Sequence, residues 1–215
     1  ILISTAAISW NFPSPFIVML SYIGIFAAAI ASVVTFGFWM PFVGFIINPR
    51  PYLAPKTWLI FAFGEGFFIG LISLSFETMF PGIVLEAVSL TFCVAATLLF
   101  LYKSGIVKPS QNFVLMVCSA VFGIFLFYIG TFIYSLITGV SPEIFSGSSN
   151  VSIGLSLFIV AMAAFSLVLD FDIIEQSAEY GSPKYMEYFG AMALVTSLIW
   201  LYIEILRLLA KFRSR

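Results

Sequence analysis

The residues of this chain that could do chemistry are acids that interrupt long apolar segments. Asp170 and Asp172 end one apolar run, and Glu65, Glu86 and Glu204 stand inside others. A carboxylate held at membrane depth costs several kcal/mol unless a partner, water or a proton neutralises it. Carboxylate oxygens also suit a hard cation such as Ca²⁺, which takes about six to eight oxygen ligands. These acids therefore indicate an ion or proton pathway.

Acids of this kind would work by exchanging protons. A desolvated carboxyl group has a raised pKa, and two carboxyl groups close together titrate as a coupled unit. The ionised form attracts a cation, and fast conduction requires that this binding stay weak. We expect Asp170 to be the central member of such a site, as a weak Ca²⁺ ligand whose protonation switches conduction.

Spacing separates the roles of Asp170 and Asp172. Two residues apart on a continuous helix, their side chains diverge by roughly 200° and cannot share a face. Asp172 also begins a polar stripe with Glu175, Gln176 and Glu179, at the spacing of a helix that extends into water. We therefore expect Asp170 to face the interior. Asp172 is either part of a solvated stripe or a second ligand.

The remaining acids each have a structural alternative. Glu204 and Arg207 stand three residues apart, so they either neutralise each other or take part in ion and pH sensing. Glu86 lies about one turn inside a predicted helix, where it either reaches the interface or faces a cavity. Glu77 and Glu143 flank turns, and we expect them to be hydrated loop acids.

The composition places the chain in a membrane. Its 215 residues are 62% hydrophobic and only 9% charged, which leaves too little polar surface for a soluble globule. A net charge of -1 provides no basic field for nucleic acid, so nucleic acid is not an expected partner. The apolar composition makes the lipid bilayer an expected partner, and the acids described above make Ca²⁺ and H⁺ expected partners. We expect no cofactor. Cys93 and Cys118 lie in apolar runs without metal spacing and are expected to be small buried hydrophobic residues.

Seven apolar segments can be interpreted as membrane helices, because about 20 apolar residues cross a hydrocarbon core. The segments cover residues 1–10, 16–47, 58–76, 83–102, 113–137, 151–170 and 188–212, with a polar connector over 175–187. The first segment is short, and we expect it to be clipped because the sequence begins at Ile1. The sequence thus predicts one all-α domain over residues 1–215, a polytopic seven-helix bundle. Gly66 and Gly70 predict a close helix contact.

Basic residues orient the bundle, since Lys and Arg concentrate in short cytoplasmic loops. The loops after the second, fourth and sixth segments carry five basic residues, whereas the loops after the first, third and fifth carry none. The five are Arg50, Lys56, Lys103, Lys108 and Lys184. A seventh full crossing would place Lys211, Arg213 and Arg215 on the opposite side, against this rule. Either the last segment crosses only partly or the tail is an exception, and we favour the full crossing.

Four segments resemble the bacterial branch of the Bax inhibitor family, also called the transmembrane Bax-inhibitor-motif family. They are Gly82-Ile83-Val84-Leu85-Glu86-Ala87, Asp170-Phe171-Asp172, Gly181-Ser182-Pro183-Lys184-Tyr185-Met186-Glu187 and Trp200-Leu201-Tyr202-Ile203-Glu204-Ile205-Leu206-Arg207. The resemblance implies a seven-helix bundle in the bacterial inner membrane with its last helix central. It further implies a pH-dependent Ca²⁺ leak through paired aspartates on the last two helices.

The first aspartate of this family pair looks like Asp170. The second falls at Ser197, so the chain departs from the family pattern at this position. Asp172, Glu65 or Glu204 would have to take the place of the missing carboxylate.

Three other functions compete with a Ca²⁺ leak. A membrane hydrolase generally relies on His, and the chain has no His, no Gly-x-Ser-x-Gly turn and no Cys framework, so we expect no enzyme. A non-conducting regulator, which some bacterial relatives resemble, would modulate a membrane-bound protease or a stress response through exposed cytoplasmic parts. A secondary transporter would need an internal repeat or broken helices, and we see no convincing example of either in the sequence.

Overall fold

The computed structural model describes residues 51–138 and 149–214. Five α-helices in these ranges are long and apolar enough to cross a membrane, with lengths of 21 to 30 residues. The first two predicted segments, 1–10 and 16–47, lie outside the described residues, so the structure supports an all-helical bundle with five candidate spans and not the count of seven. The described elements are η2 (Pro51–Leu53), a 3-10 helix, and α4 (Ala54–Met79), α5 (Ile83–Lys103), α6 (Gln111–Thr138), α8 (Asn150–Glu179) and α9 (Tyr185–Arg213).

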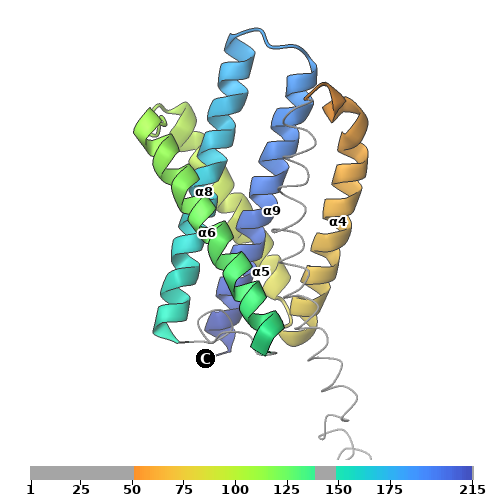
Figure 1. Cartoon of the computed structure of the whole chain (residues 1–215), viewed down its shortest axis with the longest axis vertical. Helices are drawn as coiled ribbons and strands as arrows, with labels where there is room; N and C mark the ends of the chain where they lie inside the picture. Colours follow the sequence, from red (N-terminus) through yellow and green to blue (C-terminus); the bar gives the residue numbers. More distant parts are fainter. Residues whose placement is uncertain (1–50, 139–148, 215) are drawn as a thin grey trace, which may run out of the picture.

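Successive helices of the described part run in alternating directions (Figure 1). We call the end with η2, the α5–α6 loop and the α8–α9 turn the upper end, and the end with the α4–α5 turn and the last turn of α9 the lower end. The described basic residues that the sequence assigned to opposite sides of the membrane lie at opposite ends of the bundle. Lys56, Lys103 and Lys184 belong to the upper end, while Lys211 and Arg213 belong to the lower end. α9 runs from one end of the bundle to the other.

The centre of the described bundle is α9. This helix packs against α8, α5 and α4, and more of it is buried than of any other described helix. Trp200, Leu201 and Leu206 contribute to its core and are at most 1% exposed. Gly190 allows α8 to come close, because a Cβ atom there would lie 2.9 Å from Cγ1 of Ile174. Large apolar side chains on the outer faces are exposed, as expected for surfaces that contact lipid.

The end of α8 differs from the sequence prediction. α8 continues without a break through the Asp170 region to Glu179, so the connector to α9 is short and does not begin at Glu175. Polar side chains allow this continuation because the outer side of these last turns is exposed, as at Glu175 and Gln176. The helix stops where Gly181 adopts a left-handed conformation, with φ of 62°.

Two expectations about small residues were wrong for the described part of the chain. A Cβ atom added at Gly66 or Gly70 would meet no described atom within 4 Å, so these glycines mark no close contact between the described helices. Cys93 and Cys118 are exposed and not buried, because the described helices leave their faces of α5 and α6 uncovered.

The turn between α4 and α5 is closed by Glu77. Its Oε1 accepts a hydrogen bond from the backbone N–H of Gly82 at 2.6 Å, and its Oε2 accepts one from that of Val84 at 3.2 Å. Glu77 is therefore a cap for the first N–H groups of α5, which have no partner within the helix, and it lies in the last turn of α4 and not in a loop as we expected. Glu143, the other acid of that prediction, lies outside the described residues.

Candidate functional site

Asp170 lies on the face of α8 that packs against α9. Buried residues of α8 recur at three- and four-residue spacing, and Asp170 follows Leu167 in the same series. The side chain of Ser197, which is 4% exposed on α9, interacts with the Asp170 carboxyl group. The position at which the resemblance implied a second aspartate is thus the position that faces Asp170.

Two carboxylate oxygens are buried in the bundle without a hydrogen-bond partner. These are Oδ2 of Asp170 and Oε2 of Glu65, and they lack a partner within residues 51–138 and 149–214. Glu65 is only 3% exposed. Buried polar atoms in proteins nearly always have a partner, so an unpaired carboxylate oxygen is a place where a proton, a water molecule or a cation can bind.

Glu65 lies at nearly the same level of the bundle as the pair on α8 and α9. α4 and α9 both run from the upper to the lower end (Figure 1). Phe61 and Met192 share one apolar cluster, and the hydroxyl groups of Ser73 and Tyr202 hydrogen-bond at 2.6 Å. Phe61 of α4 is therefore level with Met192 of α9, and Ser73 with Tyr202. Interpolation between these two levels places Glu65 level with about residue 195 of α9. The two carboxylates that each have one unpaired oxygen among the described residues therefore occupy one level, just above the middle of the bundle.

Asp172 belongs to a different group of residues. Its Oδ1 accepts a hydrogen bond from the Tyr102 hydroxyl at 3.3 Å, and its Oδ2 accepts one from Nε2 of Gln176 at 2.6 Å. The same tyrosine hydroxyl also donates to Oε2 of Glu175. The predicted polar stripe is present on α8, but its first member contacts α5 and lies on the side away from Asp170.

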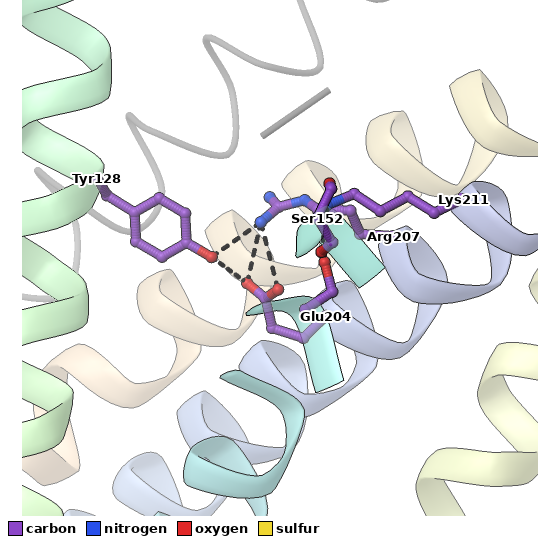
Figure 2. Close-up of polar contacts among 6 residues, drawn as sticks. Tyr128, Ser152, Glu204, Arg207 and Lys211 are labelled. Atoms are coloured by element: carbon purple, nitrogen blue, oxygen red, sulfur yellow. Dashed lines mark hydrogen bonds and ion pairs between the residues drawn. The ribbon is translucent and has the colours of Figure 1, made fainter. Parts of the chain in front are cut away.

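Glu204 forms a buried polar group with Arg207 and Tyr128 in the lower half of the bundle (Figure 2). The Tyr128 hydroxyl donates to Oε1 of Glu204 at 2.6 Å, and Nη1 of Arg207 donates to the same oxygen at 3.1 Å. Nη1 also donates to the tyrosine hydroxyl at 2.8 Å. The ion pair that the sequence allowed is therefore present. The tyrosine escaped the sequence analysis because it is 76 residues from its partner.

A second buried cation lies lower on α9. The Nζ atom of Lys211 donates to Oγ of Ser152 at 2.8 Å, to Oγ of Ser156 at 2.7 Å and to the Ser152 carbonyl oxygen at 3.3 Å. Lys211 is 6% exposed, and neither serine exceeds 1%. Sequence reasoning missed this contact between α8 and α9. The available signal was the seven-residue spacing of Ser197, Glu204 and Lys211, which places all three on one face of α9.

Glu86 joins α5 to the end of α9. Its Oε1 pairs with Nη2 of Arg213 at 2.7 Å, and Nη1 of Arg213 donates to the Pro81 carbonyl oxygen at 2.8 Å. Glu86 is exposed, which fits the alternative in which it reaches the interface. Both Lys211 and Arg213 are thus bound to oxygen atoms of the bundle, which accounts for basic residues at the end opposite the basic loops.

The described residues hold no group of three or more His, Cys, Asp or Glu side chains that could bind a metal ion. Among the acids named from the sequence, the structure brings Asp170 and Glu65 to one level. It places Asp172, Glu86 and Glu204 in three separate groups.

Comparison with known proteins gave one match. A family model described as "Bax inhibitor 1 like" matches residues 1–214, which is nearly the whole chain. A search of curated proteins and a search of solved structures gave no match.

Proposed function

Because this chain belongs to the Bax inhibitor 1 like family, we propose that it is a pH-sensitive Ca²⁺ leak channel or transporter gated by protonation of intramembrane acids. Its apolar helices and its family make it a multi-pass membrane protein. One observation carries the proposal, namely the buried Oδ2 of Asp170, which has no hydrogen-bond partner among the described residues. Such an oxygen is available to a proton or to a cation.

In the proposed mechanism, the protonation state of Asp170 controls the interface between α8 and α9. The ionised carboxylate attracts Ca²⁺, which prefers oxygen ligands, and the hydroxyl of Ser197 supplies a further oxygen at the same place. Protonation removes the charge and turns the carboxyl group into a donor for that hydroxyl, which can accept as well as donate. The leak should therefore rise with pH and fall on acidification.

We assign the second acid of the site to Glu65. Its buried Oε2 is unpaired in the described part of the chain, and its level matches that of Asp170. Asp172 instead accepts hydrogen bonds from Tyr102 and Gln176, and Glu204 is paired with Arg207. Two acids on α8 and α4 would then take the role that the family resemblance gave to two aspartates on the last two helices.

The arrangement of basic residues supports an orientation for the site. Lys56, Lys103, Lys108 and Lys184 all belong to the upper end, which makes this end cytoplasmic by the positive-inside rule. Asp170 then lies in the cytoplasmic half of the membrane, which we take to be the bacterial inner membrane.

Flux measurements on purified protein in liposomes test the proposal. Asp170→Asn should abolish most of the Ca²⁺ leak and flatten its dependence on pH, because the amide cannot ionise. Asp172→Asn is the matched control, since it makes the same change two residues away on the side that contacts α5. A protein with Asp170→Asn that leaks Ca²⁺ with wild-type rate and wild-type pH dependence would reject the proposed site.

A non-conducting regulator is the second candidate function. The last turns of α8 expose Glu175, Gln176 and Glu179 at the upper end, which offers a polar surface to a membrane-bound protease. This candidate is favoured if purified protein carries no ion flux at any pH while a membrane protease co-purifies with it. Charge reversal at Glu179 should then weaken the co-purification without affecting the fold.

A further inference from the structure

The buried polar residues of α9 form a line along one face of the helix. Ser197, Glu204 and Lys211 recur every seven residues, and none is more than 6% exposed. Seven residues are close to two helical turns, so the line is about 21 Å long. It begins beside Asp170 and ends at the lower end of the bundle. An ion that follows this face of α9 passes all three residues.

The two charged residues on this line differ in how their charges are compensated. The carboxylate of Glu204 pairs with Arg207 at 3.1 Å. In contrast, Nζ of Lys211 binds three neutral oxygens, and neither ion pair in the described ranges involves it. An ammonium group has three N–H donors and no acceptor, which matches these three contacts. The lower part of the line therefore carries a positive charge that forms no ion pair with another described residue.

We propose that Lys211 is a selectivity-determining residue whose positive charge opposes cations at the lower end of α9 and keeps the Ca²⁺ leak slow. This inference rests on the proposed function. The Coulomb energy is proportional to the charge of the passing ion, so the barrier from Lys211 is twice as high for Ca²⁺ as for K⁺. The residue thus restricts divalent more than monovalent cations.

A purely structural role for Lys211 predicts a different result. If the side chain only anchored α9 to Ser152 and Ser156 on α8, its loss would loosen the interface and admit both ions alike. The charge and the anchor can be separated by substitution. Lys211→Gln removes the charge, Lys211→Arg keeps it, and Ser156→Ala removes one contact while the charge remains.

The experiment measures Ca²⁺ and K⁺ flux in the same liposomes for the wild type and these three variants. If Lys211→Gln raises K⁺ flux about threefold, it should raise Ca²⁺ flux about ninefold, since the barrier for the divalent ion is doubled. Lys211→Arg and Ser156→Ala should leave the flux ratio at its wild-type value. Lys103→Gln, the same change at an exposed position of the upper end, should leave it unchanged as well.

The ratio of two fluxes does not depend on how much protein folds, so a poorly folding variant remains informative. Equal increases for both ions, or no increase with Lys211→Gln, overturn the inference. If K⁺ does not pass at all, a Ca²⁺ flux that rises with Gln and not with Arg at position 211 supports it. A leak that needs Asp170 but ignores Lys211 overturns only this inference, whereas no flux from any variant overturns the proposed function as well.

Discussion

Ser197 of α9 faces Asp170 of α8, at the position where the family resemblance implied a second aspartate. A hydroxyl group can donate to an ionised carboxylate and accept from a protonated one. The contact can therefore persist in both protonation states of Asp170. Two carboxylates in contact would instead repel each other when both were ionised. The exchange of a carboxylate for a hydroxyl group makes the interface between α8 and α9 less dependent on a shared proton.

Ser197→Asp should shift the pH dependence of the Ca²⁺ leak to higher pH. Two adjacent carboxylates titrate as a coupled pair, and one of them holds its proton to a higher pH than a single acid would. Ser197→Asn is the matched control because it has nearly the same shape without the charge. The measurement is Ca²⁺ flux in liposomes over a pH series, and equal midpoints for the two variants would contradict the coupling.

Glu65→Gln should lower the Ca²⁺ leak at high pH and reduce its pH dependence. The side chain is 3% exposed, lies at the level of Asp170, and would lose its ability to ionise. Glu187→Gln makes the same change at an exposed position in the first turn of α9 and should leave the flux unaltered. A wild-type pH profile with Glu65→Gln would remove Glu65 from the site while leaving Asp170 in place.

Glu204→Gln should destabilise the protein strongly, because it leaves the guanidinium group of Arg207 without its carboxylate. Removing one partner of a buried ion pair costs about 3–5 kcal/mol in the free energy of unfolding. The double variant Glu204→Leu with Arg207→Met removes both charges and should cost less than the single variant. Thermal unfolding in detergent measures both effects. If Glu204→Gln unfolds at the wild-type temperature, the pair contributes little to stability.

Gly190→Ala should lower the unfolding temperature, since the added Cβ atom would lie 2.9 Å from Cγ1 of Ile174 and push α8 and α9 apart. Gly154→Ala is the comparison, because a Cβ atom there meets nothing within 4 Å. In a helix this second change should stabilise by up to about 1 kcal/mol. Combining Gly190→Ala with Ile174→Ala should restore part of the lost stability. If Gly190→Ala alone leaves the unfolding temperature unchanged, the interface between α8 and α9 adjusts to the added methyl group without loss of stability.

The ends of α9 should lie on opposite sides of the membrane. In a protein whose Cys93 and Cys118 are replaced by Ala, Ser182→Cys tests the upper end and Ser214→Cys the lower end. A membrane-impermeant maleimide should label Ser214→Cys in intact cells and Ser182→Cys only after permeabilisation, as follows from the proposal that the lysine-rich end is cytoplasmic. Labelling of both cysteines from the same side would contradict a full crossing by α9.

Much of the described fold follows from the lengths of the apolar segments. The prediction of 83–102 differs from α5 (Ile83–Lys103) by a single residue, because Pro81 and Gly82 before it and Ser104 and Gly105 after it are poor continuations of a helix. The end of α8 was placed too early. Polar residues beyond Asp170 keep helical spacing, and hydrophobicity alone cannot separate a helix that leaves the bilayer from a loop.

Features of the candidate site could be predicted only where they depend on the geometry of a single helix. The divergence of the Asp170 and Asp172 side chains follows from the helical repeat. In the structure Asp170 contacts Ser197 of α9, whereas Asp172 contacts Tyr102 of α5. The contact of Lys211 with Ser152 joins residues 59 positions apart, so it depends on how two helices pack. Local spacing carries no information about such a pair.

The carboxylate of Glu77 has a consequence for the assembly of the protein in the bilayer. Because this side chain satisfies the N–H groups of Gly82 and Val84, these two donors of the turn between α4 and α5 do not depend on a later helix, and Arg213 of α9 adds a hydrogen bond to the Pro81 carbonyl oxygen. The hairpin of α4 and α5 can therefore close its turn with its own side chain before the helices that follow it are in place.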